Sequence, residues 1–317
     1  MEFQLFLIKY QIPHQKDVDL RKKTWIKTGG RCAYWVVPES VSQLVEVCKF
    51  LYATQMQFYI VGQTSNLFFH SSYNPEVIVS TIKINKYQID NDILTCECGV
   101  NVMKLSTELL SAGYAGFYGL VGLPGTVASA LWNNAGCFNC SLSSMLLNAE
   151  VLMPNGSICT IDYNGFEYRA RSSAFKRGEL KGIILSVQLK IERALDKIEE
   201  LSKSEETIVY RKMKQEGPRK NLGSVFSSLK RKHNVRNRIA SAVSKVIGHI
   251  GIADQNRIDK LVLLWLYGYW DLRSYISDKQ INTFVWRNEK AEYMFSKYKE
   301  FMGQVFSGLT MEIEELK

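Results

Sequence analysis

The chain has 317 residues, of which 46% are hydrophobic and 22% charged, values typical of a folded protein with room for two or three domains. Its longest apolar run, LVLLWLYGYW from Leu261, covers about half of the roughly 20 residues that a membrane span needs. The N-terminal MEFQLFLIKY lacks a basic region and a cleavage site, so we expect a strand there rather than a signal peptide. These features exclude an integral membrane protein and predict a cytoplasmic location.

Charge and cysteine content narrow the possible partners. A net charge of +9 attracts anions of any kind, including nucleic acid and membrane surfaces, and it also suits a pocket for a dinucleotide and a nucleotide-sugar diphosphate. We interpret the basic run from Lys230 to Arg238 as a solvated helix face. Seven cysteines without a disulfide framework indicate a reducing compartment. Cys137 and Cys140 form a C-x-x-C pair without further zinc ligands, so we expect buried small side chains there rather than a metal or redox site.

The first part of the chain predicts alternating strands and helices. The turn at Gly29-Gly30 leads into an apolar strand, and Ser40 with Gln43 is typical of a helix N-terminus. The apolar face of that helix consists of Val41, Leu44, Val45, Cys48 and Leu51. The run QFYIV then predicts a buried strand that ends at Gly62. The loop GQTSNL follows, and a glycine loop after a strand is a frequent phosphate site.

The middle of the chain predicts a second group of strands. Short strands are expected around Val77–Ser80 and Ile93–Cys98, followed by a helix near Val102–Ala112. Asn155-Gly156 joins two apolar runs and is a strong hairpin signal. A long apolar strand closes this region near Ile191. We interpret it all as one body split into two lobes.

The stretch GLPGTVASALWNNAG, from Gly122 to Gly136, has the composition of a turn that approaches a ligand closely. Gly122 and Gly125 can take positive φ, and Pro124 stiffens the bend between them. A helix is expected to start at Thr126, where unpaired N–H groups and the helix dipole would suit a phosphate. The alternative is a tight turn packed under a sheet.

The last third predicts a charged linker helix after Arg193 and a helical insertion over residues 230–275. The aromatic residues of the insertion are expected mainly in the core, with a pocket or an oligomer contact as alternatives; they are Trp265, Tyr267, Tyr269 and Trp270. A final amphipathic helix is expected over Asn288 to Phe306. Its buried stripe is predicted to contain Ala291, Phe295, Tyr298, Met302 and Val305.

Three polar segments are candidates for chemistry. FEYRARSSAFK offers Arg169 and Arg171, and a planar guanidinium suits a carboxylate, although a surface basic cluster is the alternative. Ser224 lies in a short G-S-x-F segment, which by itself does not indicate a function. At the end of the chain, Glu312 and Glu314 alternate onto one face of an expected strand, where most such glutamates are simply solvated.

The stretch from Gly122 resembles the flavin-loop motif G-I-P-G-T-V-G-G-A, three residues, N-A-G of UDP-N-acetylenolpyruvoylglucosamine reductases. GQTSNL is similar to the G-x-G-S-N-L loop of that family, with Thr64 in place of the second glycine. The family's opening motif is matched by Thr24, Gly29, Gly30 and Pro38.

This resemblance implies an α+β fold that joins an FAD-binding body of the vanillyl-alcohol-oxidase (PCMH) type, in two lobes, to a C-terminal α/β substrate-binding domain. The lobes are expected at residues 1–67 and 68–203, and the third domain at 204–317. The implied cofactors are FAD and NADPH. The residues expected to contact FAD are Gly62, Gln63, Thr64, Ser65, Asn66, Leu67, Gly122, Pro124, Gly125, Thr126, Ala130, Asn134 and Gly136.

The implied reaction is the NADPH-dependent reduction of UDP-N-acetylglucosamine enolpyruvate to UDP-N-acetylmuramate, in peptidoglycan precursor synthesis. The resemblance assigns Ser224 as general acid and Arg171 and Glu314 to the developing enolate, with Arg169 as the competing arginine. A UDP-sugar substrate and a monomer are implied, without nucleic acid or membrane insertion.

Departures from the family pattern leave two other hypotheses open. Ser227-Ser228-Leu229 replaces Lys-Asn-Pro, Ala170 replaces a tyrosine, and Gln280 replaces a histidine. A paralogue acting on a different nucleotide-linked substrate would account for these changes. A flavin-binding or basic interaction protein without turnover, which binds an anionic polymer through Lys230–Arg238, is the third hypothesis.

Overall fold

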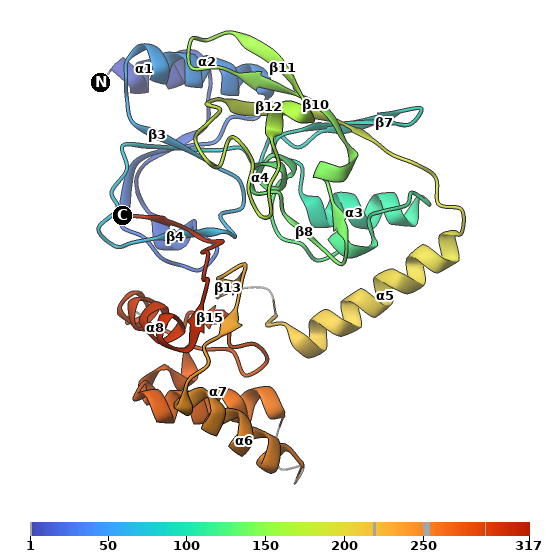
Figure 1. Cartoon of the computed structure of the whole chain (residues 1–317). Helices are drawn as coiled ribbons and strands as arrows, with labels where there is room; N and C mark the ends of the chain where they lie inside the picture. Colours follow the sequence, from blue (N-terminus) through green and yellow to red (C-terminus); the bar gives the residue numbers. More distant parts are fainter. Residues whose placement is uncertain (1, 218–219, 250–253, 289) are drawn as a thin grey trace. The chain divides into compact units, whose positions relative to one another are not determined.

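The computed structural model describes residues 2–217, 220–249, 254–288 and 290–317 (Figure 1). The chain forms two compact units, and the second takes in two short segments from the first quarter of the sequence. The first unit contains Met1–Lys22, Arg31–Thr64 and Asn74–Ile208, and the second contains Lys23–Gly30, Ser65–Tyr73 and Val209–Lys317. The predicted division at residues 67 and 203 stays a prediction.

The first sheet of unit 1 has the strand order β1–β2–β5–β3, in which β2, β5 and β3 are parallel and β1 pairs antiparallel with β2. Its strands are β1 (His14–Asp19), β2 (Arg31–Val36), β3 (Phe58–Val61) and β5 (Val77–Ser80). Helix α2 (Val41–Ala53) packs in the same core, and the Ser40 hydroxyl accepts the Gln43 N–H at 3.2 Å, as the capping signal predicts.

The N-terminal segment is a helix, α1 (Glu2–Lys9), so the prediction of a strand is wrong. Phe3 and Leu7, four residues apart, are buried on one helical face. Phe6 stacks on Phe50 of α2 with ring centroids 4.3 Å apart. A short apolar run is compatible with the spacing of a helix face and with that of a strand face. Packing against α2 favours the helix.

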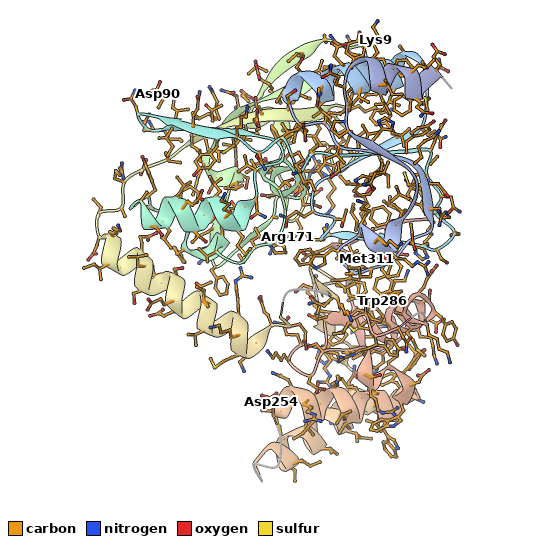
Figure 2. The ribbon with its side chains drawn as sticks, turned by 180° about the vertical axis from the view of Figure 1, so that it is seen from behind. Lys9, Asp90, Arg171, Asp254, Trp286 and Met311 are labelled. Atoms are coloured by element: carbon orange, nitrogen blue, oxygen red, sulfur yellow. The ribbon has the colours of Figure 1, made fainter. Side chains whose placement is uncertain are left out.

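The second sheet of unit 1 is antiparallel throughout, with the order β11–β10–β12–β7–β6. The hairpin at Asn155-Gly156 forms as predicted, with Gly156 at φ +84°. Asp90 lies at the tip of the β6–β7 hairpin (Figure 2). Helices α3 (Val102–Ser111) and α4 (Val127–Asn133) share a core with this sheet. The strands are β6 (Tyr87–Asp90), β7 (Ile93–Glu97), β10 (Leu146–Leu152), β11 (Ile158–Asp162) and β12 (Ile183–Lys190). The expected linker helix is α5 (Lys197–Lys214).

Unit 2 is built from helices and short strand pairs. Its helices are α6 (Val235–His249), α7 (Gln255–Tyr267) and α8 (Ala291–Val305). Its strand pairs are β13 (Asn221–Ser224) with β15 (Thr283–Val285), β14 (Lys230–Arg231) with β16 (Phe306–Ser307), and β4 (Leu67–Phe69) with β17 (Glu314–Leu316). All five residues of the predicted α8 stripe are fully buried. Position 289, inside the expected span of this helix, lies outside the described residues.

The insertion is helical, as predicted, but two of its tryptophans are not core residues. Trp265 is 71% exposed and Trp270 46% exposed, which corrects the expectation from aromatic density. Helix α7 instead buries the face that contains Ile258, Leu263 and Leu264. Within the described part of the chain, no helix combines the length and apolarity needed to cross a membrane.

Candidate active site

The Gly122–Thr126 turn is held by the end of β3. Gly122 and Gly125 have φ of +89° and +132°, as the sequence predicts. The Gly125 N–H donates to the Gln63 side-chain carbonyl at 2.9 Å. A Cβ at Gly62 would lie 2.6 Å from Thr126 Oγ1, so glycine at this position permits the close packing of the two loops.

A third segment, Cys98–Val102, completes this arrangement. Val127 N–H donates to the Val100 carbonyl at 2.8 Å, and Val102 N–H donates to the Gly125 carbonyl at 3.1 Å. A Cβ at Gly99 would lie 1.8 Å from the Thr81 carbonyl oxygen, so only glycine fits. Sequence reasoning missed Gly99, and its position between a strand and a capped helix was the available signal.

The start of α4 does not offer the free N–H groups that the sequence suggested. Thr126 and Ser129 form a capping box in which each side-chain oxygen accepts the other residue's N–H. The N–H groups of Val127 and Ala128 donate to backbone carbonyls of the third segment. These donors are used inside the protein, so an anion at this turn must be bound by other groups.

Thr64 keeps the backbone conformation that the missing glycine would adopt. It is buried and has φ +58°, in the left-handed region. A branched residue there costs about 1–2 kcal/mol relative to right-handed backbone. Glycine would adopt this left-handed backbone without that cost.

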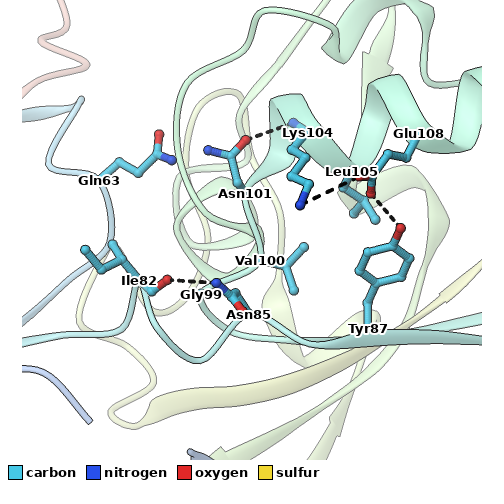
Figure 3. A pocket seen from close by; sticks show the side chains of 10 residues that line it. All are labelled: Gln63, Ile82, Asn85, Tyr87, Gly99, Val100, Asn101, Lys104, Leu105 and Glu108. Carbon is cyan, nitrogen blue, oxygen red and sulfur yellow. Dashed lines mark hydrogen bonds and ion pairs between the residues drawn. The ribbon is translucent and has the colours of Figure 1, made fainter. Parts of the chain in front are cut away.

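A cavity of about 220 Å³ opens beside the first loop (Figure 3). Lys104 Nζ lies 3.8 Å from a Glu108 carboxylate oxygen, and the Tyr87 hydroxyl donates to Glu108 at 2.6 Å. The hydrogen bond to Glu108, burial and the carboxylate charge raise the pKa of Tyr87 to about 12, so its hydroxyl stays protonated. The cavity is lined by Gln63, Ile82, Asn85, Tyr87, Gly99, Val100, Asn101, Lys104, Leu105 and Glu108. It offers donors and acceptors to a polar ligand.

The far end of the glycine stretch makes contacts within the protein. Asn134 is left-handed, with φ +47°, and its side-chain amide donates to the Arg169 carbonyl at 2.8 Å. A Cβ at Gly136 would lie 2.5 Å from the Cys140 carbonyl oxygen. Ala130 is buried in the core. These contacts shape the loop, and direct contact of the three residues with FAD stays a prediction.

The C-x-x-C pair lies in a small hairpin formed by β8 (Gly136–Cys137) and β9 (Cys140–Ser141). Cys140 is buried, as predicted, whereas Cys137 is only half-buried and donates through Sγ to the Gly119 carbonyl at 3.2 Å. Among the residues that the structure describes, no group of three or more His, Cys, Asp or Glu side chains is arranged to hold a metal ion.

Arg171, labelled in Figure 2, is fixed against the glycine stretch. Its backbone is left-handed, with φ +55°, and its Nη1 donates to the Gly136 carbonyl at 2.6 Å. Ser173 beside it is fully buried and donates to the Trp132 carbonyl at 2.7 Å. The Arg169 side chain is 64% exposed and lies 3.8 Å from Glu179. Of the two arginines, Arg171 is the one whose guanidinium is pre-positioned.

In unit 2, the segments that contain Ser224 and Glu314 are joined by backbone hydrogen bonds. Ser224 ends β13, is exposed, and pairs with Thr283 of β15. The carbonyl of the next residue, Val225, accepts the Glu312 N–H at 2.9 Å. Phe226 and Met311, the latter labelled in Figure 2, form an isolated bridge beside this bond.

Asn66 holds the same C-terminal segment from its other side. Its side-chain amide donates to the Glu312 carbonyl at 2.9 Å, and its own carbonyl accepts the Glu314 N–H at 3.1 Å. Ile313 is buried, whereas Glu312 and Glu314 are half-buried. Because β17 begins at Glu314, the expectation that both glutamates share one strand face stays a prediction. Unit 2 therefore brings together Ser224's strand, the loop residue Asn66 and Glu314, whereas Arg171 belongs to unit 1.

A charged cluster next to Glu314 was missed by sequence reasoning. His70 Nε2 lies 2.8 Å from Glu315 Oε2, and His70 Nδ1 lies 2.8 Å from Glu292 Oε1. Burial raises the pKa of both carboxyls, but hydrogen bonds and nearby cations outweigh burial and leave both pKa values below normal. His70 and Glu315 are 245 residues apart, and no local sequence pattern predicts that they pair.

Comparison with known proteins places this geometry in context. A family model described as "FAD binding domain" matches residues 32–162. The chain is 30% identical to a UDP-N-acetylenolpyruvoylglucosamine reductase of Caldicellulosiruptor bescii over 227 aligned residues. The alignment covers 71% of this chain and 72% of that protein. The chain is also 30% identical to the reductase of Clostridium kluyveri over 193 residues, 59% of this chain and 62% of that one.

Among solved structures, the fold is similar to that of UDP-N-acetylenolpyruvylglucosamine reductase from Thermus caldophilus. The TM-score is 0.66 at 20% sequence identity, over 96% of this chain and 99% of the other. At this identity the likeness concerns the fold, and it confirms the predicted α+β architecture with an FAD-binding body.

Proposed function

Because the chain belongs to the UDP-N-acetylenolpyruvoylglucosamine reductase family, we propose that it reduces UDP-N-acetylglucosamine enolpyruvate to UDP-N-acetylmuramate, with NADPH as the electron donor. The protein is an FAD-dependent oxidoreductase, and this reaction places it in peptidoglycan precursor synthesis. The observation that carries the proposal is the 30% identity over 71% of the chain, in a protein that has both glycine loops of the family.

The residues present fit a bound dinucleotide. Gly122 and Gly125, both with positive φ, allow the backbone of their turn to approach a ligand closely, and the cavity beside Gln63 supplies polar groups. Bound FAD would supply the hydride transfer from NADPH to the terminal vinyl carbon of the enol ether. We propose that FAD is held by Gly62, Gln63, Thr64, Ser65, Asn66, Leu67, Gly122, Pro124, Gly125, Thr126, Ala130, Asn134 and Gly136.

Arg171 and Glu314 stabilise the negative charge that develops on the substrate carboxylate as the enolate forms. The hydrogen bond to the Gly136 carbonyl orients the Arg171 guanidinium, whose planar fork suits a carboxylate. An ionised Glu314 would repel the developing enolate, so it contributes either as a protonated group or across a bridging cation. Both roles are proposals supported by the family motif.

Ser224 donates the proton that completes the reduction. Hydride adds to the vinyl carbon away from the ether, so the adjacent carbon needs a proton once the enolate has formed. A hydroxyl within hydrogen-bond reach can supply that proton as general acid. Support comes from the exposed position of Ser224 at the end of β13, next to the segment that contains Glu314. We also propose a cytoplasmic location, because NADPH and nucleotide sugars are intracellular metabolites. The monomeric state stays a prediction.

A second candidate is a reductase for a different nucleotide-linked substrate. It is favoured by Ser227-Ser228-Leu229 and by Gln280, whose side-chain carbonyl accepts the Thr283 hydroxyl at 3.4 Å. The insertion also exposes a large aromatic side chain, Trp265, which a helix that only fills the core would bury.

The test is a pair of half-reactions followed by flavin absorbance. The purified protein is reduced anaerobically with NADPH, and UDP-N-acetylglucosamine enolpyruvate is then added. Prompt return of the oxidised flavin spectrum supports the proposed reaction. Reduction without return on adding the enol ether indicates a different substrate, and a bound flavin that NADPH leaves oxidised indicates a protein without this turnover.

A further inference from the structure

His70, in the segment after β4, contacts the C-terminal strand at two points and helix α8 at a third. The His70 backbone N–H donates to the Leu316 carbonyl at 2.8 Å. Its ring reaches Glu315 of β17 through Nε2 and Glu292 of α8 through Nδ1, each at 2.8 Å. The Ser71 N–H adds a 3.0 Å hydrogen bond to the second oxygen of Glu292. One histidine therefore links β4, β17 and the first turn of α8.

Both nitrogens of this ring face carboxylate oxygens, Nδ1 that of Glu292 and Nε2 that of Glu315. Ionised carboxylates only accept hydrogen bonds, so both ring nitrogens act as donors when the ring carries both protons. The other charged groups of the cluster are Lys299, which pairs with Glu315 Oε1, and Lys317, which lies 3.5 Å from Glu315 Oε2. The ring edge packs on Phe68, with centroids 5.0 Å apart.

Burial makes these contacts stronger than surface ion pairs. The side chain of His70 is 12% exposed and that of Glu315 is 8% exposed. A solvent-poor, charge-assisted pair holds its partners more rigidly than an exposed one, because water competes less for its hydrogen bonds. Removing the His70 ring leaves Glu315 paired with Lys299 and Lys317 alone, without the contact that ties it to Glu292 and α8.

Glu315 directly follows Glu314 on β17. Successive side chains of a strand point to opposite faces, so fixing the Glu315 side chain on one face fixes the direction of Glu314 on the other. The Glu314 N–H, held by the Asn66 carbonyl, secures the backbone between them. The cluster thus fixes Glu315 on the strand from which the Glu314 side chain projects.

We propose that His70 is a positioning residue, which orients Glu314 for the reaction by clamping Glu315 and β17. This inference rests on the proposed function, because that function assigns the catalytic role to Glu314. The family motif covers Glu314 but neither His70 nor Glu315, and the assignment comes from the geometry of the cluster.

The test compares His70→Gln with Lys297→Gln, in which the lost ion pair is with Asp271, also in unit 2 but outside the cluster. Amide hydrogen exchange reports the mobility of residues 314–316, and stopped-flow flavin reoxidation reports the reaction. We expect His70→Gln to speed exchange in β17 and to lower the maximal reoxidation rate at least tenfold with little change in KM. His70→Arg, a cation with several donors, should recover part of that rate, and Lys297→Gln should change neither readout.

Three results would overturn the positioning role. They are an unchanged reoxidation rate in His70→Gln, a rise in KM alone, and exchange that increases evenly across unit 2. If His70→Gln does not fold, Glu315→Gln decides by the same measures. A wild-type protein that fails to reoxidise with the enol ether rejects the proposed function, whereas wild-type turnover with an unaffected His70→Gln rejects the positioning role alone.

Discussion

The side-chain amide of Asn66 donates a 2.9 Å hydrogen bond to the backbone carbonyl of Glu312, 246 residues further along the chain. Since the Asn66 carbonyl also accepts the Glu314 N–H, one asparagine of the first glycine loop holds the C-terminal segment on both sides of Ile313. The loop proposed to contact FAD and the glutamate proposed to act on the substrate are thereby mechanically connected.

Replacing Asn66 with alanine should loosen this connection. We expect a loss of about 1 kcal/mol in the free energy of unfolding, because the Glu312 carbonyl loses its side-chain donor. Flavin reoxidation by the enol ether should slow as well. Thermal unfolding and stopped-flow absorbance check the two effects. Ser227→Ala, which removes an exposed 3.2 Å hydrogen bond to the Thr310 carbonyl, is the control and should stay within about 0.5 kcal/mol of wild type.

Ser224→Ala should separate the two half-reactions. Loss of a general acid typically costs a factor of about 10²–10⁴, and only the step that protonates the substrate should suffer. Reduction of the flavin by NADPH should keep its wild-type rate, while reoxidation by the enol ether slows by that factor. Equal slowing of both steps, or an equal effect of Ser227→Ala, would contradict the assignment of Ser224.

The two candidate arginines are distinguished by Arg171→Lys and Arg169→Lys. Lysine cannot reproduce a bidentate fork or the contact that orients Arg171 on the Gly136 carbonyl. We expect kcat/KM of Arg171→Lys to fall by a factor of about 10² or more, a loss of nearly 3 kcal/mol of transition-state stabilisation. Arg169→Lys, at an exposed site, should lie close to wild type. The reverse ranking would shift the role to Arg169.

Gly99→Ala should destabilise the protein and weaken FAD retention. The added Cβ would meet the Thr81 carbonyl at 1.8 Å, so backbone must move, at a cost of about 1–3 kcal/mol or more. Gly303→Ala is the control, because its Cβ would point into open space on helix α8. That change should stabilise by up to about 1 kcal/mol. Denaturant unfolding and flavin release measure the contrast.

The His70 cluster should make the stability of unit 2 depend on pH in the acid range. The pKa values of Glu292 and Glu315 lie below their ordinary 4.5, so these groups stabilise the fold when ionised. That contribution is present above pH 4.5 and is lost as the pH falls through the lowered folded-state values. Glu315→Gln should flatten the acid limb of a stability profile followed by tryptophan fluorescence. An unchanged limb would indicate that other carboxyls dominate it.

Much of the fold follows from local pattern. The period of α8, the cap at Ser40 and the Asn155-Gly156 hairpin were predictable because each depends on residues within one or two turns of chain. The short run that forms α1 was not, because its apolar residues satisfy either period until Phe50 selects one. The exposure of Trp265 was missed for a related reason, since composition does not say which helix face is covered.

For the site, the sequence by itself determined the two glycine loops, because backbone freedom is a property of single residues and short motifs. The resemblance to the reductase family supplied the candidates Arg171, Ser224 and Glu314, whose own segments are too short to indicate a catalytic role. Only the tertiary structure decided which groups meet. The N–H groups at the start of α4 donate to groups within the protein, and Gly99 packs against the Thr81 carbonyl. His70 lies between Glu292 and Glu315. Such pairings depend on distances between segments far apart in the chain, and no local pattern encodes those distances.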